Sequence, residues 1–525
     1  MRLTLCAALF LLTAAITITT QAYAESALPE GGPTEKSRFE NARGIYMLGS
    51  YEPAVAELRN IARDFPKGEY ADDAYYWLGM YAMMTGNYDE ALGHFTRVTS
   101  QMSNSDMAAA AQLEAAYCYS EPANPKHDYD KAIAEFMKLP FFYPDSTLID
   151  DAAYHAALCQ MKTGRYVQAG EDLRAFANRY PGSEYAAPAL YQLGMTFIMQ
   201  GKTDDALNAF QSVRDNHPAG LYRQRALDKI ELVVHTRDRR APKLSSTYGS
   251  KGSAPGTFNK PSGAGLDEDG RLYVADSGNS RVQRLTYTSS GLALDVPVFG
   301  PPSPDKEQKM SQPVGVAAGP KGLIYVADAS ANRVQVLGPD GSLVLSFGRR
   351  GKEAGEFDGP CGVVVDEGGN IYVADRGNRR VSRFDPKGRP LGVVGVFGTR
   401  EEDRMGAPSG LALDLEGNLL VTDNKKDRLY KFDPAGKLVT VVGGEDGRGN
   451  KRLDDPAGVG VDGIGNVYVA SQGSKSIVVL DRGLNQLAVT EGDGDALDKP
   501  TGLAVSEAGV VFVTDAGQGK VVVFK

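Results

Sequence analysis

The sequence predicts two repeat domains, an α-solenoid of helical hairpins followed by an all-β six-bladed propeller that is closed by an N-terminal strand. A chain of 525 residues is too long for one hydrophobic core, so two or more domains are expected. One motif recurs five times at intervals of 37 to 41 residues in the N-terminal half, and another recurs six times at intervals of 44 to 52 residues in the rest. Fixed periods of this length are typical of repeat architectures.

The first 24 residues are expected to form a cleavable secretory signal. Arg2 precedes a mostly apolar run from Leu3 to Ile18, and Ala22-Tyr23-Ala24 places small residues at the −1 and −3 positions of a cleavage site. A buried or anchoring helix is the alternative interpretation. Cys6 lies at the start of the apolar run, which is the wrong place for a lipoprotein cleavage site. No later segment has 18 consecutive apolar residues, so no membrane span is predicted and the protein is expected to be periplasmic or secreted.

The bulk composition excludes several classes of protein. The chain is 42% hydrophobic and 23% charged, and its net charge of −9 gives no electrostatic argument for a nucleic-acid partner. Cleavage of the signal leaves Cys118, Cys159 and Cys361, which is too few for a disulfide framework. Cys118 and Cys159 fall at equivalent positions of adjacent repeats, about 10 Å apart, so we expect buried thiols rather than a bridge.

A helical domain is predicted over 37–237, after a linker over 25–36. The motif is a Gly-x-Tyr turn, then an Ala, an apolar residue four positions later, and in most copies a Pro eight positions after that; the third copy lacks the Gly, and the fifth has Thr203 in place of the Tyr. Gly ends the first helix of the hairpin, Ala permits close helix approach, and Pro stops the second helix. Residues 221–235 are expected to form a closing amphipathic helix. The repeated alanines are Ala54, Ala91, Ala132, Ala169 and Ala206.

This pattern closely resembles the tetratricopeptide repeat. The phrase YPGSEYAAPALYQLG is similar to the subtype found in bacterial periplasmic Tol–Pal and outer-membrane-assembly proteins. The third copy departs from the family because residues 121–128 replace the short turn. The resemblance implies a superhelix whose first helices line a concave face that binds proteins or peptides.

Aromatic and Met residues recur at i, i+4 and i+7 on the first helix of each hairpin, which places them on one face. One interpretation is a groove for a peptide or a partner helix, because Met adapts to varied ligands. The alternative is that the same residues pack one repeat against the next. The candidate partner-binding residues are Tyr76, Met80, Met83, Tyr154, Met161, Tyr191 and Met195.

A propeller is predicted over 243–525, after a linker over 238–242. Each unit has Pro-x-Gly, an apolar strand, a YVAD-like strand and a turn, and most units also have Asp-x-x-Gly between the two strands and Arg after the turn. Four short β-rich runs per unit indicate a propeller blade. The phrase GEFDGPCGVVVDEGGNIYVADRGNRRVSRF closely matches the NHL repeat family, whereas the fifth unit departs most, with Ser471 and Ser476 in place of the Asp and Arg. The six prolines are Pro261, Pro313, Pro360, Pro408, Pro456 and Pro500.

The sixth unit has only three strands before Lys525. Residues 243–249 are expected to supply the fourth strand, because SSTYG resembles the fourth strands of other units and closure removes two exposed sheet edges. The alternative is that this stretch is linker.

The recurring Asp and Arg are expected to be structural, with each Asp capping the following turn and pairing with the Arg five residues later. Seven basic residues gather in the third and fourth units, where a solvated surface is expected and an anion site is the alternative. These seven are Arg376, Arg379, Arg380, Arg383, Lys425, Lys426 and Arg428.

The propeller sequence carries no sign of a catalytic or metal site. Similar propellers include histidine-dependent lyases, a zinc-dependent amidating lyase and calcium lactonases, but all five His residues of this chain precede residue 243. The inner strands show no carboxylate cage for calcium. The domain has 34 Lys+Arg and 36 Asp+Glu, a net of −2, which argues against the RNA binding known for some NHL propellers.

The sequence therefore favours a non-catalytic exported scaffold, without cofactor or metal, that binds protein or cell-envelope partners. The long loops between blades are the expected binding face of the propeller, because binding concentrates on variable loops of a rigid scaffold. The alternative function is a hydrolase or lactonase acting on sugars, lactones or peptidoglycan fragments with loop carboxylates.

Overall fold

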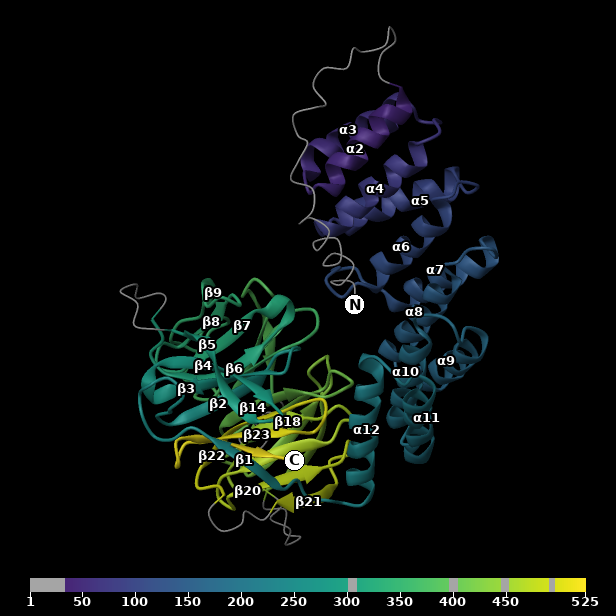
Figure 1. The fold of residues 1–525 in the computed structure, drawn as a ribbon. Helices are drawn as coiled ribbons and strands as arrows, with labels where there is room; N and C mark the ends of the chain where they lie inside the picture. The colour runs from purple at the N-terminus through teal and green to yellow at the C-terminus, as the bar shows by residue number, and fades with distance from the viewer. Residues whose placement is uncertain (1–33, 301–308, 396–404, 445–452, 491–495) are drawn as a thin grey trace. The chain divides into compact units, whose positions relative to one another are not determined.

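The computed structural model describes residues 34–300, 309–395, 405–444, 453–490 and 496–525. The expected signal sequence and its cleavage site lie outside these residues. The chain divides into two compact units, Met1–Cys118 and Tyr119–Lys525, and each is described by itself. Helices precede sheets along the chain, as Figure 1 shows. Within the described ranges, no helix is long and apolar enough to cross a membrane.

The helical part consists of paired helices of nearly equal length, as the repeat predicts. The first unit contains α2 (Glu35–Met47), α3 (Tyr51–Asp64), α4 (Ala71–Met84), α5 (Tyr88–Gln101) and most of α6 (Ala108–Ser120). The second unit continues with α7 (Tyr129–Phe142), α8 (Ile149–Lys162), α9 (Tyr166–Arg179), α10 (Ala186–Met199), α11 (Thr203–Asn216) and α12 (Leu221–Arg237).

The motif residues act as the sequence predicts. The five repeated alanines are each 0% exposed, so the second helix of every hairpin approaches its neighbours without an intervening side chain. Four of the turn glycines, Gly49, Gly86, Gly164 and Gly201, have φ between 72° and 81°, which an L side chain adopts only with strain. In the third repeat the longer connection ends at Asp128, whose side chain accepts a hydrogen bond from the Lys131 N–H and caps α7.

Six four-stranded antiparallel sheets form the blades. Blades one to three are β2 (Pro261–Leu266), β3 (Arg271–Asp276), β4 (Arg281–Thr288) and β5 (Gly291–Phe299); β6 (Pro313–Ala318), β7 (Ile324–Asp328), β8 (Arg333–Leu337) and β9 (Leu343–Phe347); β10 (Pro360–Val365), β11 (Ile371–Asp375), β12 (Arg380–Phe384) and β13 (Pro390–Val394).

The remaining blades follow the same order. Blades four to six are β14 (Pro408–Leu413), β15 (Leu419–Asp423), β16 (Arg428–Phe432) and β17 (Leu438–Gly443); β18 (Pro456–Val461), β19 (Val467–Ser471), β20 (Ser476–Leu480) and β21 (Gln486–Thr490); β22 (Pro500–Val505), β23 (Val511–Asp515) and β24 (Lys520–Phe524) with β1 (Leu244–Tyr248).

The expected closure by the N-terminal strand is confirmed. Strand β1 pairs antiparallel with β24, and Thr247 lies opposite Val522. A bulge at Ser245 interrupts the pairing between Leu244 and Ser246. The first strand of the propeller therefore completes its last blade and ties the two ends of the ring together.

Side chains on the inner strands join each blade to the next. The Ser262 hydroxyl donates to the Val314 carbonyl at 2.9 Å, and the Ser409 hydroxyl donates to the Pro456 carbonyl at 3.2 Å. The Thr501 hydroxyl donates to the Pro261 carbonyl at 2.9 Å, so the same contact links the sixth blade to the first. These positions lie between the Pro and Gly of the motif, which explains why small hydroxyl residues recur there.

The recurring Asp is structural, as predicted: Asp328 caps the turn after its strand by accepting a hydrogen bond from the Ala331 N–H at 3.3 Å. The same Asp position also binds the loop that precedes the blade. Asp276 accepts a hydrogen bond from the Asn259 N–H at 2.7 Å and pairs with Arg281 at 2.8 Å. In the fifth blade the Ser471 hydroxyl takes over the first of these contacts and accepts from the Asp454 N–H at 2.9 Å. Each such residue thus fixes the loop that enters its own blade.

Candidate partner-binding surfaces

The first unit presents three candidate residues on α4, and all three are half-buried. The Tyr76 ring packs 6.0 Å from the Phe95 ring of α5, the second helix of the same hairpin. The Met83 sulfur lies 3.6 Å from the Cys118 sulfur of α6. Met80 lies between them, one turn from each. These side chains rest on neighbouring helices and still present part of their surface to solvent.

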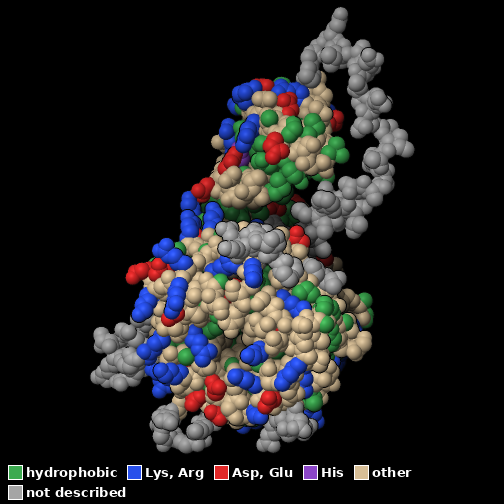
Figure 2. Space-filling view, turned by 90° about the vertical axis from the view of Figure 1, so that its left-hand side faces the viewer, with side chains coloured by type: hydrophobic (Ala, Val, Ile, Leu, Met, Phe, Trp, Pro, Cys, Tyr) green, Lys and Arg blue, Asp and Glu red, His purple; other side chains and the backbone are tan. Residues whose placement is uncertain are grey.

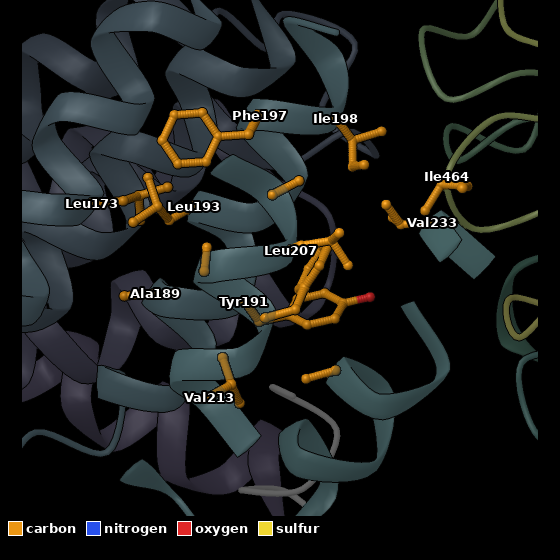
Figure 3. Close-up of a cluster of buried hydrophobic side chains, with 14 of the residues drawn as sticks. Leu173, Ala189, Tyr191, Leu193, Phe197, Ile198, Leu207, Val213, Val233 and Ile464 are labelled. Atoms are coloured by element: carbon orange, nitrogen blue, oxygen red, sulfur yellow. The ribbon is translucent and has the colours of Figure 1, made fainter. Parts of the chain in front are cut away.

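In the second unit the tyrosines equivalent to Tyr76 are buried. Tyr154 is 5% exposed and Tyr191 is 6% exposed, and both belong to one hydrophobic cluster that also contains Leu173, Leu207 and Phe210. Figure 3 shows Tyr191 among these side chains. The Tyr191 ring lies 5.5 Å from both the Phe210 ring and the Tyr222 ring. Burial raises the pKa of both Tyr154 and Tyr191 above the ordinary value.

Met161 and Met195 lie at the edge of the same cluster, where they are half-buried. Of the seven candidate residues, five therefore retain solvent-accessible surface and two do not. Tyr154 and Tyr191 contribute to packing between helices in this structure, and the methionines beside them remain accessible.

Cys118, Cys159 and Cys361 are free and buried, as the repeat spacing predicts for the first two. Burial raises the pKa of the Cys159 thiol to about 12 and that of Cys361 to about 11. Neither thiol is therefore ionised near neutral pH, and neither is a candidate nucleophile.

Helices α8, α10 and α12 contact one face of the propeller. We call it the tight-turn face, because it carries the turns between the first and second strands and between the third and fourth strands of each blade. Helix α12 runs along this face in Figure 1. The Asn466 amide donates to the Thr236 hydroxyl at 2.8 Å, and the Arg482 guanidinium donates to the Ile198 carbonyl at 2.7 Å. Lys162 pairs with Glu367 at 2.6 Å. This face of blades three, five and six is thus in contact with the chain's own helices.

Lys229 of α12 inserts into this contact. It is 2% exposed, and its ammonium donates to the Glu507 carbonyl at 3.0 Å. Burial lowers its pKa, while Glu507, Asp462 and Asp228 act in the opposite direction. A Cβ atom at Gly463 would lie against the Lys229 ammonium and 2.5 Å from the Glu507 backbone carbonyl oxygen, so a larger residue at that position of the blade-five turn would displace this contact.

Sequence reasoning missed this internal contact, although a signal was present. The turn Asp462-Gly463-Ile464-Gly465-Asn466 carries an apolar residue where the equivalent turn of blade three reads Asp366-Glu367-Gly368-Gly369-Asn370. Ile464 is 4% exposed and joins the helical cluster next to Val233, as Figure 3 shows. An apolar side chain at an otherwise polar turn tip indicates a covered surface.

Beside this contact lies a cavity of about 200 Å³ between α12 and blades five and six. Asp228, Glu231 and His235 line the helix side, and Lys525 and Leu487 lie on the propeller side. Its charges are mixed. In the ranges that the structure describes, no group of three or more His, Cys, Asp or Glu side chains is arranged to hold a metal ion.

Family comparisons match both halves of the chain. A tetratricopeptide-repeat model matches residues 73–105, and a model described as outer membrane lipoprotein matches residues 119–236. A model of the NHL repeat matches residues 258–285, 310–337 and 357–384, which correspond to the first three blades.

The chain is a tetratricopeptide-type helical array fused to an NHL-repeat β-propeller.

Solved structures add little to this tetratricopeptide–NHL assignment. A streptogramin B lyase is 13% identical with a TM-score of 0.39, and the match covers 54% of this chain and 98% of that chain. Virginiamycin B lyase from Staphylococcus aureus is 12% identical with a TM-score of 0.37, covering 52% and 82%. A structural-genomics protein of unknown function from Bacteroides thetaiotaomicron is 16% identical with a TM-score of 0.42, covering 54% and 76%. Similarity this weak carries no argument about chemistry.

No curated protein matches the tetratricopeptide–NHL chain significantly. Both repeat types are of the kind that supports protein interaction, and the outer-membrane-lipoprotein match is compatible with export. The assignment therefore indicates a scaffold built from two interaction domains.

Proposed function

We propose that this protein is a non-catalytic exported scaffold that holds protein or cell-envelope partners through two surfaces. One surface is the groove of the helical array, and the other is the loop face of the propeller, which carries the loops between blades and the turns after each YVAD-like strand. The observation that carries the proposal is the contact of α12 with the tight-turn face. That contact occupies one side of the propeller and leaves the loop face for partners.

Two further observations support the proposal. The outer-membrane-lipoprotein match falls on 119–236, the helical part that packs on the propeller. The half-buried Tyr76, Met80, Met83, Met161 and Met195 provide adaptable apolar surface on the first helices of their hairpins. In this proposal Tyr154 and Tyr191 support the groove from beneath.

Site-specific photocrosslinking in the native cell envelope tests both surfaces in the full-length protein. A photoreactive amino acid replaces Met80 in the groove, Ser474 on the loop face, or Asp340 on the tight-turn face as a control. Ser474 and Asp340 are both exposed. We expect the Met80 and Ser474 positions to capture partner proteins and the Asp340 position to capture none. Capture only at Asp340, or at none of the three, contradicts the proposal.

A further inference from the structure

Five of the seven basic residues of blades three and four fall into two groups in the structure. Arg380 pairs with Asp375 at 2.9 Å, the Arg379 guanidinium donates to the Met405 carbonyl at 3.0 Å, and the Arg383 guanidinium stacks 5.6 Å from the Tyr372 ring. These three arginines hold the blades together. Arg376 and Lys425 instead lie exposed on the turns that follow the second strands.

Those turns surround the mouth of the propeller on its loop face, because the inner strands of all six blades begin there. The Arg376 guanidinium donates to the Asn424 side-chain oxygen at 3.2 Å, which joins the turn of blade three to the turn of blade four. Lys425 is the next residue along. Two adjacent turns therefore present exposed cations side by side.

Asp455 extends this arrangement to blades five and six. Burial raises the pKa of Asp455, Asp427 adds to the rise, and Arg376 and Lys499 act to lower the pKa. One carboxylate thus lies within electrostatic range of a cation from blade three and a cation from blade six. Lys499 is itself exposed.

Lys260 completes the set in blade one. Lys499 and Lys260 both directly precede the first Pro of their blades, and the Thr501 hydrogen bond to the Pro261 carbonyl places those two blade entrances next to each other. Lys260 and Asp455 share the same register and both have φ of 50°, a backbone region that non-glycine residues rarely occupy. We name Lys260, Arg376, Lys425 and Lys499 the cationic arc.

The cationic arc has four positive charges, and the acids beside it are Asp427 and Asp455, with exposed Asp454 and Asp498 at the entrances of blades five and six. Asp498 is already paired with Lys475 at 2.9 Å, and the chain as a whole has a net charge of −9. Figure 2, which views the molecule from the side opposite α12, shows Lys and Arg side chains spread over the propeller with fewer Asp and Glu among them. The local positive charge therefore does not follow from the overall composition. The positive charge is a property of the loop face.

We propose that the cationic arc binds a carboxylate-rich segment of a protein partner. This inference rests on the proposed function, because the proposed function makes the loop face a binding face. The inference adds the chemistry of the partner that the loop face recognises. Single-stranded nucleic acid is bound largely by stacking bases on exposed aromatic rings. Among the described residues of the propeller, the exposed large hydrophobic side chains are Leu and Val, with no aromatic ring. An acidic peptide needs no stacking surface.

The test measures binding of a fluorescein-labelled acidic peptide, built from Asp-Ser-Glu-Gly repeats, to the full-length protein by fluorescence anisotropy. The variant carries Arg376→Glu with Lys425→Glu. The matched control carries Lys387→Glu with Lys437→Glu, which reverses two exposed cations on the tight-turn face. A peptide with Asn and Gln in place of Asp and Glu controls for charge, and a single-stranded oligonucleotide controls for ligand class.

We expect the Arg376/Lys425 variant to bind the acidic peptide at least about tenfold more weakly and the control variant to bind within about twofold of the parent. Binding is expected to weaken as salt is raised. Equal loss in both variants, equal binding of the neutral peptide, or tighter binding of the oligonucleotide overturns the inference. If no acidic peptide binds while Ser474 still captures partners, only this inference fails; if Ser474 captures nothing, the proposed function of the loop face fails as well.

Discussion

Single residues decide how closely the elements of this chain approach one another. The repeated alanines of the second helices are fully buried, and Gly463 and Gly509 leave room for Lys229 and Leu232 of α12. At the tyrosine register of the first helices, burial depends on the repeat. Tyr191 is 6% exposed, whereas Tyr76 keeps part of its ring in solvent. The same residue type in the same register is therefore buried to a different extent in different repeats.

Truncating the two tyrosines separates these contributions. Tyr191→Ala is expected to lower the free energy of unfolding by about 3 kcal/mol or more, because it leaves a cavity beside Phe210 and Tyr222. Tyr76→Ala is expected to cost about 1 kcal/mol and to weaken partner capture at Met80 instead. Thermal melts of both variants measure the difference. An equally large loss in both assigns Tyr76 to the core and removes it from the groove.

Asp73 in α4 gives the first unit a pH dependence. Burial, together with Asp72 and Asp106, raises its pKa from 3.8 to about 6, while Arg43 opposes the shift. The folded state then holds the proton more tightly than the unfolded state. This contribution to stability is fully present below pH 3.8 and is lost as the pH rises through about 6.

Asp73→Asn is accordingly expected to remove this decline and to stabilise the protein near neutral pH. Denaturant melts at a series of pH values between about 4 and 7 measure the effect. Asp204→Asn, an exposed acid in the first turn of α11, controls for the loss of one negative charge. A parent protein whose stability does not fall over this range contradicts the assignment.

At the scale of elements, strand β1 closes the ring through the ladder it shares with β24. Its pairing is interrupted at the Ser245 bulge and is regular from Ser246 to Tyr248. Lys243 and Lys525 exchange two backbone hydrogen bonds, so by the alternation of an antiparallel pair the Ser246 N–H points toward β24 and the Thr247 N–H points away from it. Ser246 should therefore tolerate proline far less well than Thr247, because proline removes an N–H donor.

Ser246→Pro is expected to destabilise the propeller by about 3 kcal/mol, and Thr247→Pro by less than about 1 kcal/mol. Ser246 is half-buried and Thr247 is exposed, so neither substitution removes a buried side chain. The denaturant midpoint of each variant provides the measurement. Equal midpoints would show that the β1 ladder adds little to closure.

At the scale of the whole second unit, α12 couples the helices to the propeller. The contact depends on glycine in the turns of blades five and six, because a Cβ atom at Gly509 would overlap the Leu232 side chain. The equivalent Gly270 of blade one has a similar φ of 77°, and a Cβ atom added there would meet nothing within 4 Å. An alanine at either position would adopt the same unfavourable positive φ. Only at Gly509 would its Cβ atom also meet the Leu232 side chain.

Gly509→Ala is expected to loosen the contact, with faster proteolysis near 238–242 and helical and propeller melts that no longer coincide. Gly270→Ala is expected to show only the cost of backbone strain, about 1 kcal/mol. Limited proteolysis and thermal melts followed at a helical and a β signal distinguish the two. Identical behaviour of the variants would show that Leu232 packing does not couple the domains.

Most of the architecture could be predicted from the sequence alone, because the repeat lengths and the turn residues within each repeat specify it. Two repeat lengths, the turn glycines and the Pro–Asp landmarks predicted the hairpins, the six blades and the closing strand. The Asp–Arg pairs were also predictable, since both partners lie within one motif. The domain limits at 37–237 and 243–525 remain a prediction from the sequence. The two compact units of the structure meet between Cys118 and Tyr119.

Only the tertiary structure decided which surfaces are covered. The insertion of Lys229 between Gly463 and Glu507 and the cationic arc bring together residues from distant repeats, and Tyr154 and Tyr191 are buried where Tyr76 in the same register is not. A repeat pattern specifies each unit and its nearest neighbours, but it carries no information about contacts between unlike domains. Those contacts depend on a few side chains that depart from the repeat, such as Ile464, and their effect appears only when the chain is folded.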